Sequence, residues 1–157
     1  MKITETWVKA PPLKGARILL AAECVKNLYP EVFEELSKGR VVFTCCLEVE
    51  NATLLMGKLA SIIRCSKPKE IAVASIEGSP HCLLLHMAVN EALFDTQARD
   101  ITVKHYVVLE GEVVEVSEEA ARIARYLHLV EEALRRCPDL LEKLKEHSLE
   151  HRWASGA

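Results

Sequence analysis

Short apolar blocks alternate with longer segments of helical periodicity along most of the chain. Four such blocks predict strands at residues 16–22, 40–44, 70–76 and 101–109. Continuous hydrophobic runs of this length are typical of parallel strands that are covered on both faces. A fifth block, EVVEV at 112–116, follows directly after Glu110 and Gly111. This short interruption predicts a hairpin and therefore an antiparallel edge to the sheet.

Helices are predicted in the segments between the strands and after the hairpin. Pro30, Asn51 and Ser79 supply start signals, and Ser117 and Pro138 mark two further helix starts. The predicted helices cover residues 30–39, 51–68, 80–98, 117–136 and 138–152. The helix over 80–98 is apolar on nearly all sides, so we expect it to be buried.

This alternation predicts an α/β fold with three layers. We expect a mostly parallel, doubly wound sheet of the flavodoxin or Rossmann-like type, with an antiparallel edge hairpin and C-terminal helices. A chain of 157 residues, 50% of them hydrophobic, has room for one domain with a sizeable core. We therefore expect a single domain over 1–157, with an N-terminal arm at 1–15 and a C-terminal helix and tail at 138–157. Apolar helix faces larger than one small sheet can cover favour a homo-oligomer.

Charge and composition limit the classes of binding partner and the cellular compartment that we expect. The net charge is −3 with acidic and basic residues interspersed, which argues against nucleic-acid or anionic-membrane binding. No apolar run approaches the roughly 20 residues that span a bilayer, and no signal-peptide core is visible, so we expect a cytoplasmic protein. Gln97 is the only glutamine, and such a low content of thermolabile amides is typical of proteins from heat-loving organisms. Disulfides occur inside cells mainly in such organisms, so the cysteine count alone does not separate a disulfide from a metal site.

Four of the six cysteines lie toward the carboxyl ends of predicted strands: Cys24 just past the first, Cys45 and Cys46 at the end of the second, and Cys82 in the first turn of the helix after the third. The carboxyl ends of parallel strands share one edge, and ligands bind in the crevice where the strand order reverses. We therefore expect these four thiols to converge. Cys65 and Cys137 each end a helix, and we expect both to pack as small hydrophobic residues.

The converging thiols indicate a metal site. Thiolates suit zinc and iron-sulfur clusters, although no C-x-x-C spacing is present. Cys82 lies in the first turn of a helix, where the macrodipole lowers the pKa of a thiol. We predict that Cys45, Cys46 and Cys82, with Cys24 or His81 as the fourth ligand, hold an iron-sulfur cluster or zinc. A redox or electron-transfer role with a redox protein partner would follow, while a disulfide among these thiols and simple packing remain alternatives.

The turn before the same helix has a second interpretation that needs no metal. A helix N-terminus preceded by Gly78 and Ser79 suits a phosphate or carboxylate, so Gly78, Ser79, His81 and Cys82 would bind a small anion or nucleotide. The common glycine-rich phosphate-binding motifs are absent. A third alternative is an assembly subunit without catalysis. No motif identifies a reaction, so whether the protein is an enzyme stays open. We expect His86 to be a hydrogen-bonded core residue.

Two segments carry family resemblances. TCCLEVE at 44–50 and EIAVASIEGSPHC at 70–82 resemble the iron-sulfur small subunits of respiratory complex I and nickel-iron hydrogenases. That resemblance implies cluster ligands at Cys45, Cys46 and Cys82 in a flavodoxin-like domain, although the family's Cys-Pro segment has no counterpart after Cys82. The chain is also similar to β-carbonic anhydrases, whose zinc thiolates and histidine follow strands of an α/β sheet. As a whole it resembles an archaeal-type α/β protein.

Overall fold

A computed structural model describes residues 1–156 of the chain. The chain divides into two compact units, residues 1–118 and residues 119–157, and each is described by itself. Unit 1 contains the whole sheet, and unit 2 is helical. None of the helices within residues 1–156 is long and apolar enough to cross a membrane.

Unit 1 is built on a five-stranded sheet with the strand order β2-β1-β3-β4-β5. The strands are β1 (Arg17–Ala22), β2 (Val41–Cys45), β3 (Glu70–Ile76), β4 (Thr102–Leu109) and β5 (Glu112–Val116). The first four strands are parallel to one another, and β5 is antiparallel to β4. The predicted α/β fold, with a mostly parallel sheet and an antiparallel edge, is confirmed.

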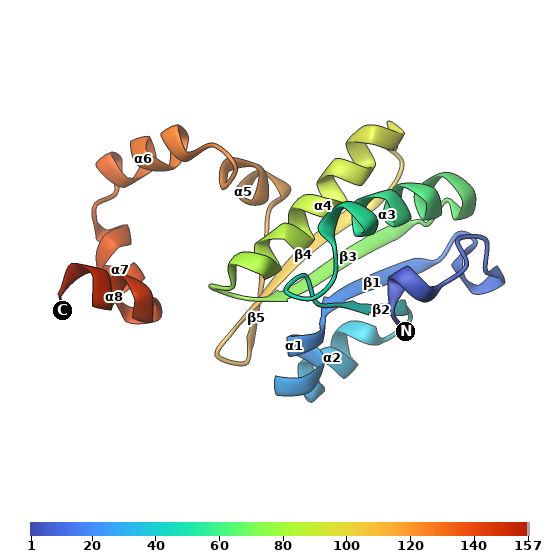
Figure 1. The fold of residues 1–157 in the computed structure, drawn as a ribbon, viewed down its shortest axis with the longest axis horizontal. Coiled ribbons are helices and arrows are strands. Elements are labelled where there is room, and N and C mark those ends of the chain that lie inside the picture. The colour runs from blue at the N-terminus through green and yellow to red at the C-terminus, as the bar shows by residue number, and fades with distance from the viewer. Residues whose placement is uncertain (157) are drawn as a thin grey trace. The chain divides into compact units, whose positions relative to one another are not determined.

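Helices cover both faces of this sheet and complete three layers. They are α1 (Glu23–Leu28), α2 (Pro30–Ser37), α3 (Ala52–Ser66) and α4 (Pro80–Thr96), and the arm adds two 3-10 turns, η1 (Ile3–Glu5) and η2 (Pro11–Leu13). Figure 1 shows α1 and α2 on one side of the sheet and α3 and α4 on the other. Helices α3 and α4 begin at the expected caps, because the side chains of Asn51 and Ser79 accept hydrogen bonds from the backbone N–H groups of Leu54 and Cys82.

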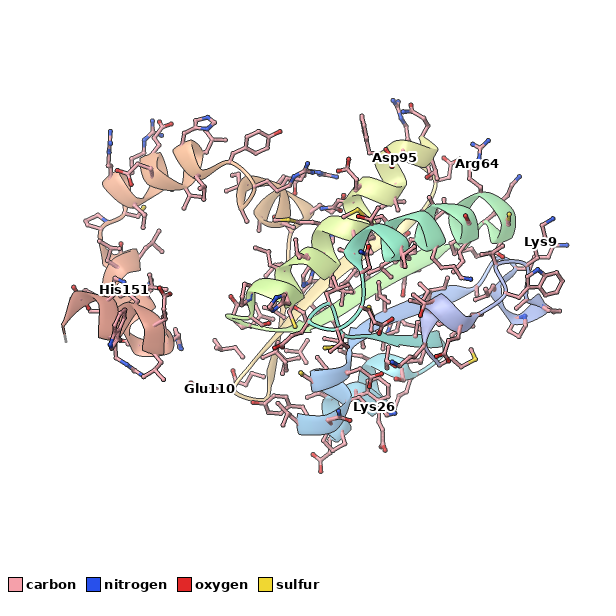
Figure 2. The ribbon with its side chains drawn as sticks, in the orientation of Figure 1. Lys9, Lys26, Arg64, Asp95, Glu110 and His151 are labelled. Atoms are coloured by element: carbon pink, nitrogen blue, oxygen red, sulfur yellow. The ribbon has the colours of Figure 1, made fainter. Side chains whose placement is uncertain are left out.

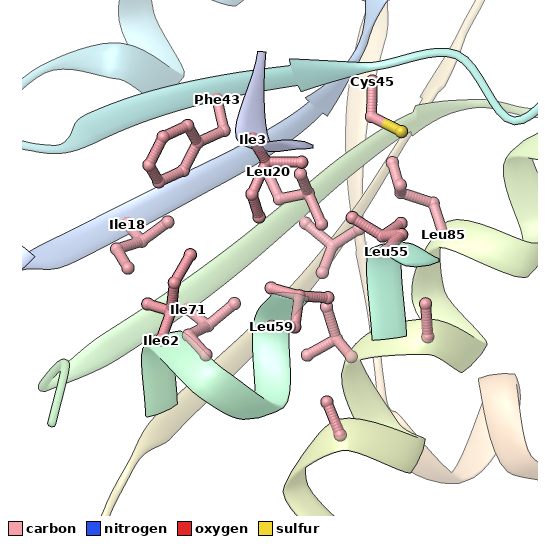
Figure 3. Packing of buried hydrophobic residues seen from close by; sticks show 14 of the residues in the cluster. Ile3, Ile18, Leu20, Phe43, Cys45, Leu55, Leu59, Ile62, Ile71 and Leu85 are labelled. Carbon is pink, nitrogen blue, oxygen red and sulfur yellow. The ribbon is translucent and has the colours of Figure 1, made fainter. Parts of the chain in front are cut away.

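The larger core lies between the sheet and the α3–α4 layer (Figure 3). Leu55, Leu59 and Ile62 of α3 recur at helical spacing and share this core with inward residues of the four parallel strands, among them Ile18 and Ile71. The opposite face holds a smaller cluster of Leu19, Ala21, Leu36, Ala72, Ala74 and Tyr106. The strands are therefore held from both sides, and this fixes the positions of the loops that leave their ends.

Unit 2 consists of short helices. They are α5 (Glu118–Ile123), which starts at the boundary between the units, α6 (Leu127–Arg136), α7 (Asp139–His147) and α8 (Leu149–Ser155). The prediction of one continuous helix over 117–136 is wrong, because the chain tightens after α5 and Tyr126 adopts a φ of −115° and a ψ of 82°. The predicted helix over 138–152 also divides in two. Ser148 caps a new helix there by accepting a hydrogen bond from the His151 N–H.

Candidate functional site

The strand order places a crevice at the carboxyl edge of the sheet, between β1 and β3. After β1 the chain enters α1 on one face, and after β3 it enters α4 on the other face (Figure 1). β1 and β3 are neighbours, so the connections diverge between them. This is the topological switch point, where open α/β sheets bind their ligands.

A small pocket of about 30 Å³ opens at this edge, and we call it the thiol pocket. Its lining residues are Ala22, Glu23, Cys24, Cys45, Cys46, Leu47, Glu48, Ser79, His81, Cys82 and Leu85. The structure thus brings together all five residues of the predicted metal site. It also brings in Ser79 of the predicted anion site, whereas Gly78 does not line the pocket.

Cys45 differs from the other thiols because it is still part of a strand. It is the last residue of β2, where side chains alternate between faces, so Cys45 shares the core face with Phe43. The side chain is 1% exposed and belongs to the same cluster as Leu55 and Leu85 (Figure 3). Burial, and then the carboxylate of Glu50, raises the pKa of Cys45 to about 12. Cys45 therefore stays protonated at neutral pH.

Cys24, Cys46 and Cys82 form the accessible part of the thiol set. Cys24 is exposed, Cys46 and Cys82 are partly buried, and none of the three is in a disulfide. Desolvation raises the pKa of Cys24, and the charges of Cys82, Cys46 and Glu48 raise it further. The thiols of Cys82 and Cys46 therefore lie close enough to Cys24 to oppose its ionisation, and protons or a bound cation would relieve this repulsion.

Two carboxylates complete the lining, and sequence reasoning missed both. Glu23 is held against β2, because the Thr44 hydroxyl donates to its Oε1 at 2.7 Å. Glu48 lies in the turn after Cys46, and Glu50 closes this turn by accepting a hydrogen bond from the Cys46 N–H at 3.1 Å. The sequence did contain a signal, since each acid lies within two positions of a predicted cysteine ligand. Their charge favours a cation in the pocket and disfavours an anion.

The turn at 78–82 is arranged as an ordinary capped helix start. Gly78 has a φ of +77°, which favours glycine, and the Ser79 hydroxyl oxygen accepts from the Cys82 N–H at 3.3 Å. That bond occupies one of the N–H groups that an anion would need. His81 is exposed at the rim of the pocket. The turn is therefore better suited to presenting the Cys82 thiol than to cradling a phosphate.

The coordination shell is not preassembled. Within residues 1–156, no group of three or more His, Cys, Asp or Glu side chains is arranged so that it holds a metal ion. The pocket gathers soft sulfur donors and carboxylate oxygens around a small volume, which suits a soft or borderline divalent cation chemically. Coordination would require rotation of these side chains, and Cys24, being exposed, has the space for it.

A buried histidine pair lies behind the pocket on the α4 face of the sheet. As expected, His86 is buried and hydrogen-bonded, with its Nε2 2.7 Å from the Ser75 hydroxyl. Its Nδ1 lies 2.9 Å from Nδ1 of His105, a partner that sequence reasoning missed. Burial first, and then His105, lowers the pKa of His86 to about 4. His86 is therefore a neutral part of the core at physiological pH.

Cys65 and Cys137 lie outside the thiol pocket. Both are exposed, so the expectation that they pack as buried residues is wrong. Cys65 falls outside the buried face of α3, which includes Leu59, Ile62 and Ser66. Cys137 follows α6, in which no residue is buried.

Comparison with known proteins identifies the family. A family model described as a Rossmann-like domain matches residues 10–152. No curated protein and no solved structure matches the chain, so the resemblances to iron-sulfur small subunits and β-carbonic anhydrases gain no support. The family match agrees with the strand order and with the layers of helices in unit 1. The chain belongs to the Rossmann-like domain family.

Proposed function

We propose that the thiol pocket binds a single thiophilic metal ion, with Zn²⁺ as the best match, through Cys24, Cys46 and Cys82. One observation carries the proposal: three cysteines that follow three different strands, Cys24 in α1, Cys46 after β2 and Cys82 in α4, line the same pocket at the topological switch point. Zn²⁺ favours such thiolates, and His81 or Glu48 would supply a fourth ligand. Cys45 would not be a ligand but would pack in the core beneath the pocket and help to hold its lining in place.

The volume of the pocket favours one ion over the larger ligands. About 30 Å³ is close to the roughly 30 Å³ that one water molecule occupies in the liquid. Pockets for nucleotide-sized ligands measure roughly 300–1,000 Å³. An iron-sulfur cluster or a nucleotide would therefore require the loops at this edge to move apart.

The role of the ion follows from its coordination. Zn²⁺ held by three protein ligands with an open fourth position acts as a Lewis acid, and a closed four-ligand site is structural. The chain offers both arrangements, because His81 is exposed and free to turn toward or away from the pocket. Binding would displace protons from the thiols, so the affinity should rise with pH.

Cobalt titration of metal-free protein tests the proposal. We expect wild type and Cys65→Ser, which removes an exposed thiol outside the pocket, to bind one equivalent and to show sulfur-to-cobalt charge-transfer absorption. Cys46→Ser and Cys82→Ser should each bind at least about tenfold more weakly, because each removes a ligand. Equal affinity in Cys65→Ser and Cys82→Ser would refute the metal site.

The same proteins separate this proposal from anion binding at Gly78, Ser79, His81 and Cys82. An anion site predicts that phosphate raises the melting temperature of the metal-free protein and that Zn²⁺ has no effect. The metal site predicts that Zn²⁺ raises the melting temperature, and that any effect of phosphate is the same in wild type and in Cys82→Ser. We expect the metal result, because two carboxylates line the pocket and the Ser79 cap already occupies the Cys82 N–H.

A further inference from the structure

A second and much larger pocket lies at the opposite, amino edge of the sheet. Its volume is about 510 Å³, and it opens where α3 and α4 end and the chain enters β3 and β4. Its lining residues are Ile63, Arg64, Lys67, Pro68, Lys69, Thr96, Gln97, Ala98, Arg99, Asp100 and Ile101. We call it the basic pocket, and Figure 2 shows Arg64 near the end of α3 that borders it.

The lining of the basic pocket is positively charged, whereas the chain as a whole has a negative net charge. Arg64, Lys67, Lys69 and Arg99 face a single acid, Asp100, in a protein whose net charge is −3. None of these four cations forms an ion pair with a described residue. Concentrated cations that are not neutralised by ion pairs in a concave site raise the local concentration of anions.

Helix ends account for only part of this charge. Arg64 and Lys67 lie at the C-terminus of α3, where the macrodipole favours cations, and Arg64 also donates to the Thr96 carbonyl at 3.5 Å. Lys69 and Arg99 lie in the connections beyond the helices, where that explanation does not apply. The Thr102 N–H donates to the Lys69 carbonyl at 3.0 Å, so the two connections are joined.

The backbone conformation at the ends of α3 and α4 also supports a function for the basic pocket. Lys67 has a φ of 46° and Gln97 a φ of 55°, in the left-handed region where glycine is preferred at helix ends. A non-glycine residue in this conformation carries a conformational cost. The chain therefore keeps two polar side chains at the basic pocket, in positions where glycine would be more stable.

We propose that the basic pocket binds a phosphorylated small molecule of nucleotide size. The cations would hold the phosphates, with Arg64 and Arg99 suited to bidentate contacts. Ile63, Pro68 and Ile101 would provide apolar surface for the uncharged part of the ligand. The volume lies within the roughly 300–1,000 Å³ of small-molecule pockets. This site is separate from the thiol pocket and does not depend on metal binding there.

Isothermal titration at low ionic strength without divalent metal tests this proposal, with ATP, tripolyphosphate, adenosine and a single-stranded oligonucleotide as probes. We expect ATP and tripolyphosphate to bind and adenosine not to bind. Lys69→Ala combined with Arg99→Ala should weaken ATP binding by about tenfold or more, since each cation contributes charge-assisted hydrogen bonds. The matched control Lys26→Ala removes an exposed cation outside the basic pocket and should leave the affinity unchanged.

Lys67→Gly provides a variant whose result does not depend on damage to the fold. Glycine fits the observed φ, so this change should raise the melting temperature while it weakens ATP binding. Cys82→Ser should bind ATP as wild type does, which separates this site from the thiol pocket. Absence of binding by both polyanions, equal losses in Lys26→Ala and the double variant, or preference for adenosine or the oligonucleotide over ATP would each overturn the proposal.

Discussion

Two adjacent cysteines of this protein have different environments because one of them lies on a strand. Cys45 is the last residue of β2 and faces the core, whereas Cys46 begins the following turn and is partly buried at the pocket. The pKa of Cys45, raised to about 12, keeps that thiol neutral. A tandem Cys-Cys at a strand end therefore provides one packing residue and one available thiol, and this reduces the predicted ligand set to Cys24, Cys46 and Cys82.

The buried histidine pair makes stability depend on pH. The pKa of His86 falls from 6.5 in the unfolded chain to about 4 in the folded protein, so the fold favours the neutral ring. The contribution of His86 to the free energy of unfolding is fully present above about pH 6.5. It is lost as the pH falls from 6.5 toward 4, because in this range the unfolded chain binds a proton at His86 and the folded protein does not. The free energy of unfolding should fall by about 3 kcal/mol over this range, because each unit of difference between the two pKa values corresponds to about 1.36 kcal/mol.

Urea denaturation of metal-free protein at a series of pH values measures this dependence. His86→Gln keeps a partner for the Ser75 hydroxyl but does not titrate, so it should flatten the decline between pH 6.5 and 4. His128→Gln, which changes an exposed histidine of α6, should decline as wild type does. The same slope in wild type and His86→Gln would show that the pair does not set the acid sensitivity.

At the level of elements, one ion cluster joins the amino ends of three strands. Glu70 begins β3 and accepts hydrogen bonds from Arg17 of β1, at 3.0–3.2 Å, and from Arg40 beside β2, at 2.6 Å. Burial by itself raises the pKa of Glu70, but the hydrogen bonds and charges of Arg40 and Arg17 outweigh it and lower the pKa. The carboxylate therefore stays charged and holds the register of the strands at this edge.

Arg40→Ala should be strongly destabilising because it leaves the Glu70 carboxylate buried beside the half-exposed Arg17 alone. Breaking a buried pair in this way costs about 3–5 kcal/mol, whereas Arg17→Ala should cost about 1 kcal/mol or less. The side chains of Arg40 and Arg17 are 9% and 49% exposed, which is the basis of this difference. Equal losses in urea denaturation at pH 7 would contradict this role for burial.

Much of the order of elements could be predicted from the sequence. Continuous apolar runs located all five strands to within a residue or so, and the Asn51 and Ser79 caps located α3 and α4. Helix α1 was missed because its six residues lack a capping side chain. The break before α6 carries no glycine or proline, so local pattern contained no signal for it.

The candidate site could be predicted in its location but not in its details. Parallel strands bring their carboxyl ends to one edge whatever their side chains are, so the convergence of Cys24, Cys46 and Cys82 followed from topology. The contribution of Glu23 depends on its hydrogen bond with Thr44, a contact between α1 and β2 that no single segment reveals. The pairing of His86 with His105 likewise required the register of α4 on β4.

For the whole molecule, the sheet has chemically different edges. The carboxyl edge carries thiols and carboxylates around about 30 Å³, and the amino edge carries four cations around about 510 Å³. The two proposed ligands therefore have opposite charges and opposite locations in unit 1. Self-association, a redox partner and cytoplasmic location remain predictions from the sequence.

X-ray absorption at the zinc edge measures whether Cys24, Cys46 and Cys82 coordinate one metal ion, as we propose. Anaerobically purified protein loaded with one equivalent of Zn²⁺ should show a sulfur shell at about 2.3 Å with about three scatterers. Cys82→Ser should lose one of these sulfurs and Cys65→Ser none. A shell of only nitrogen and oxygen at about 2.0–2.1 Å would show that the cysteines do not coordinate the ion.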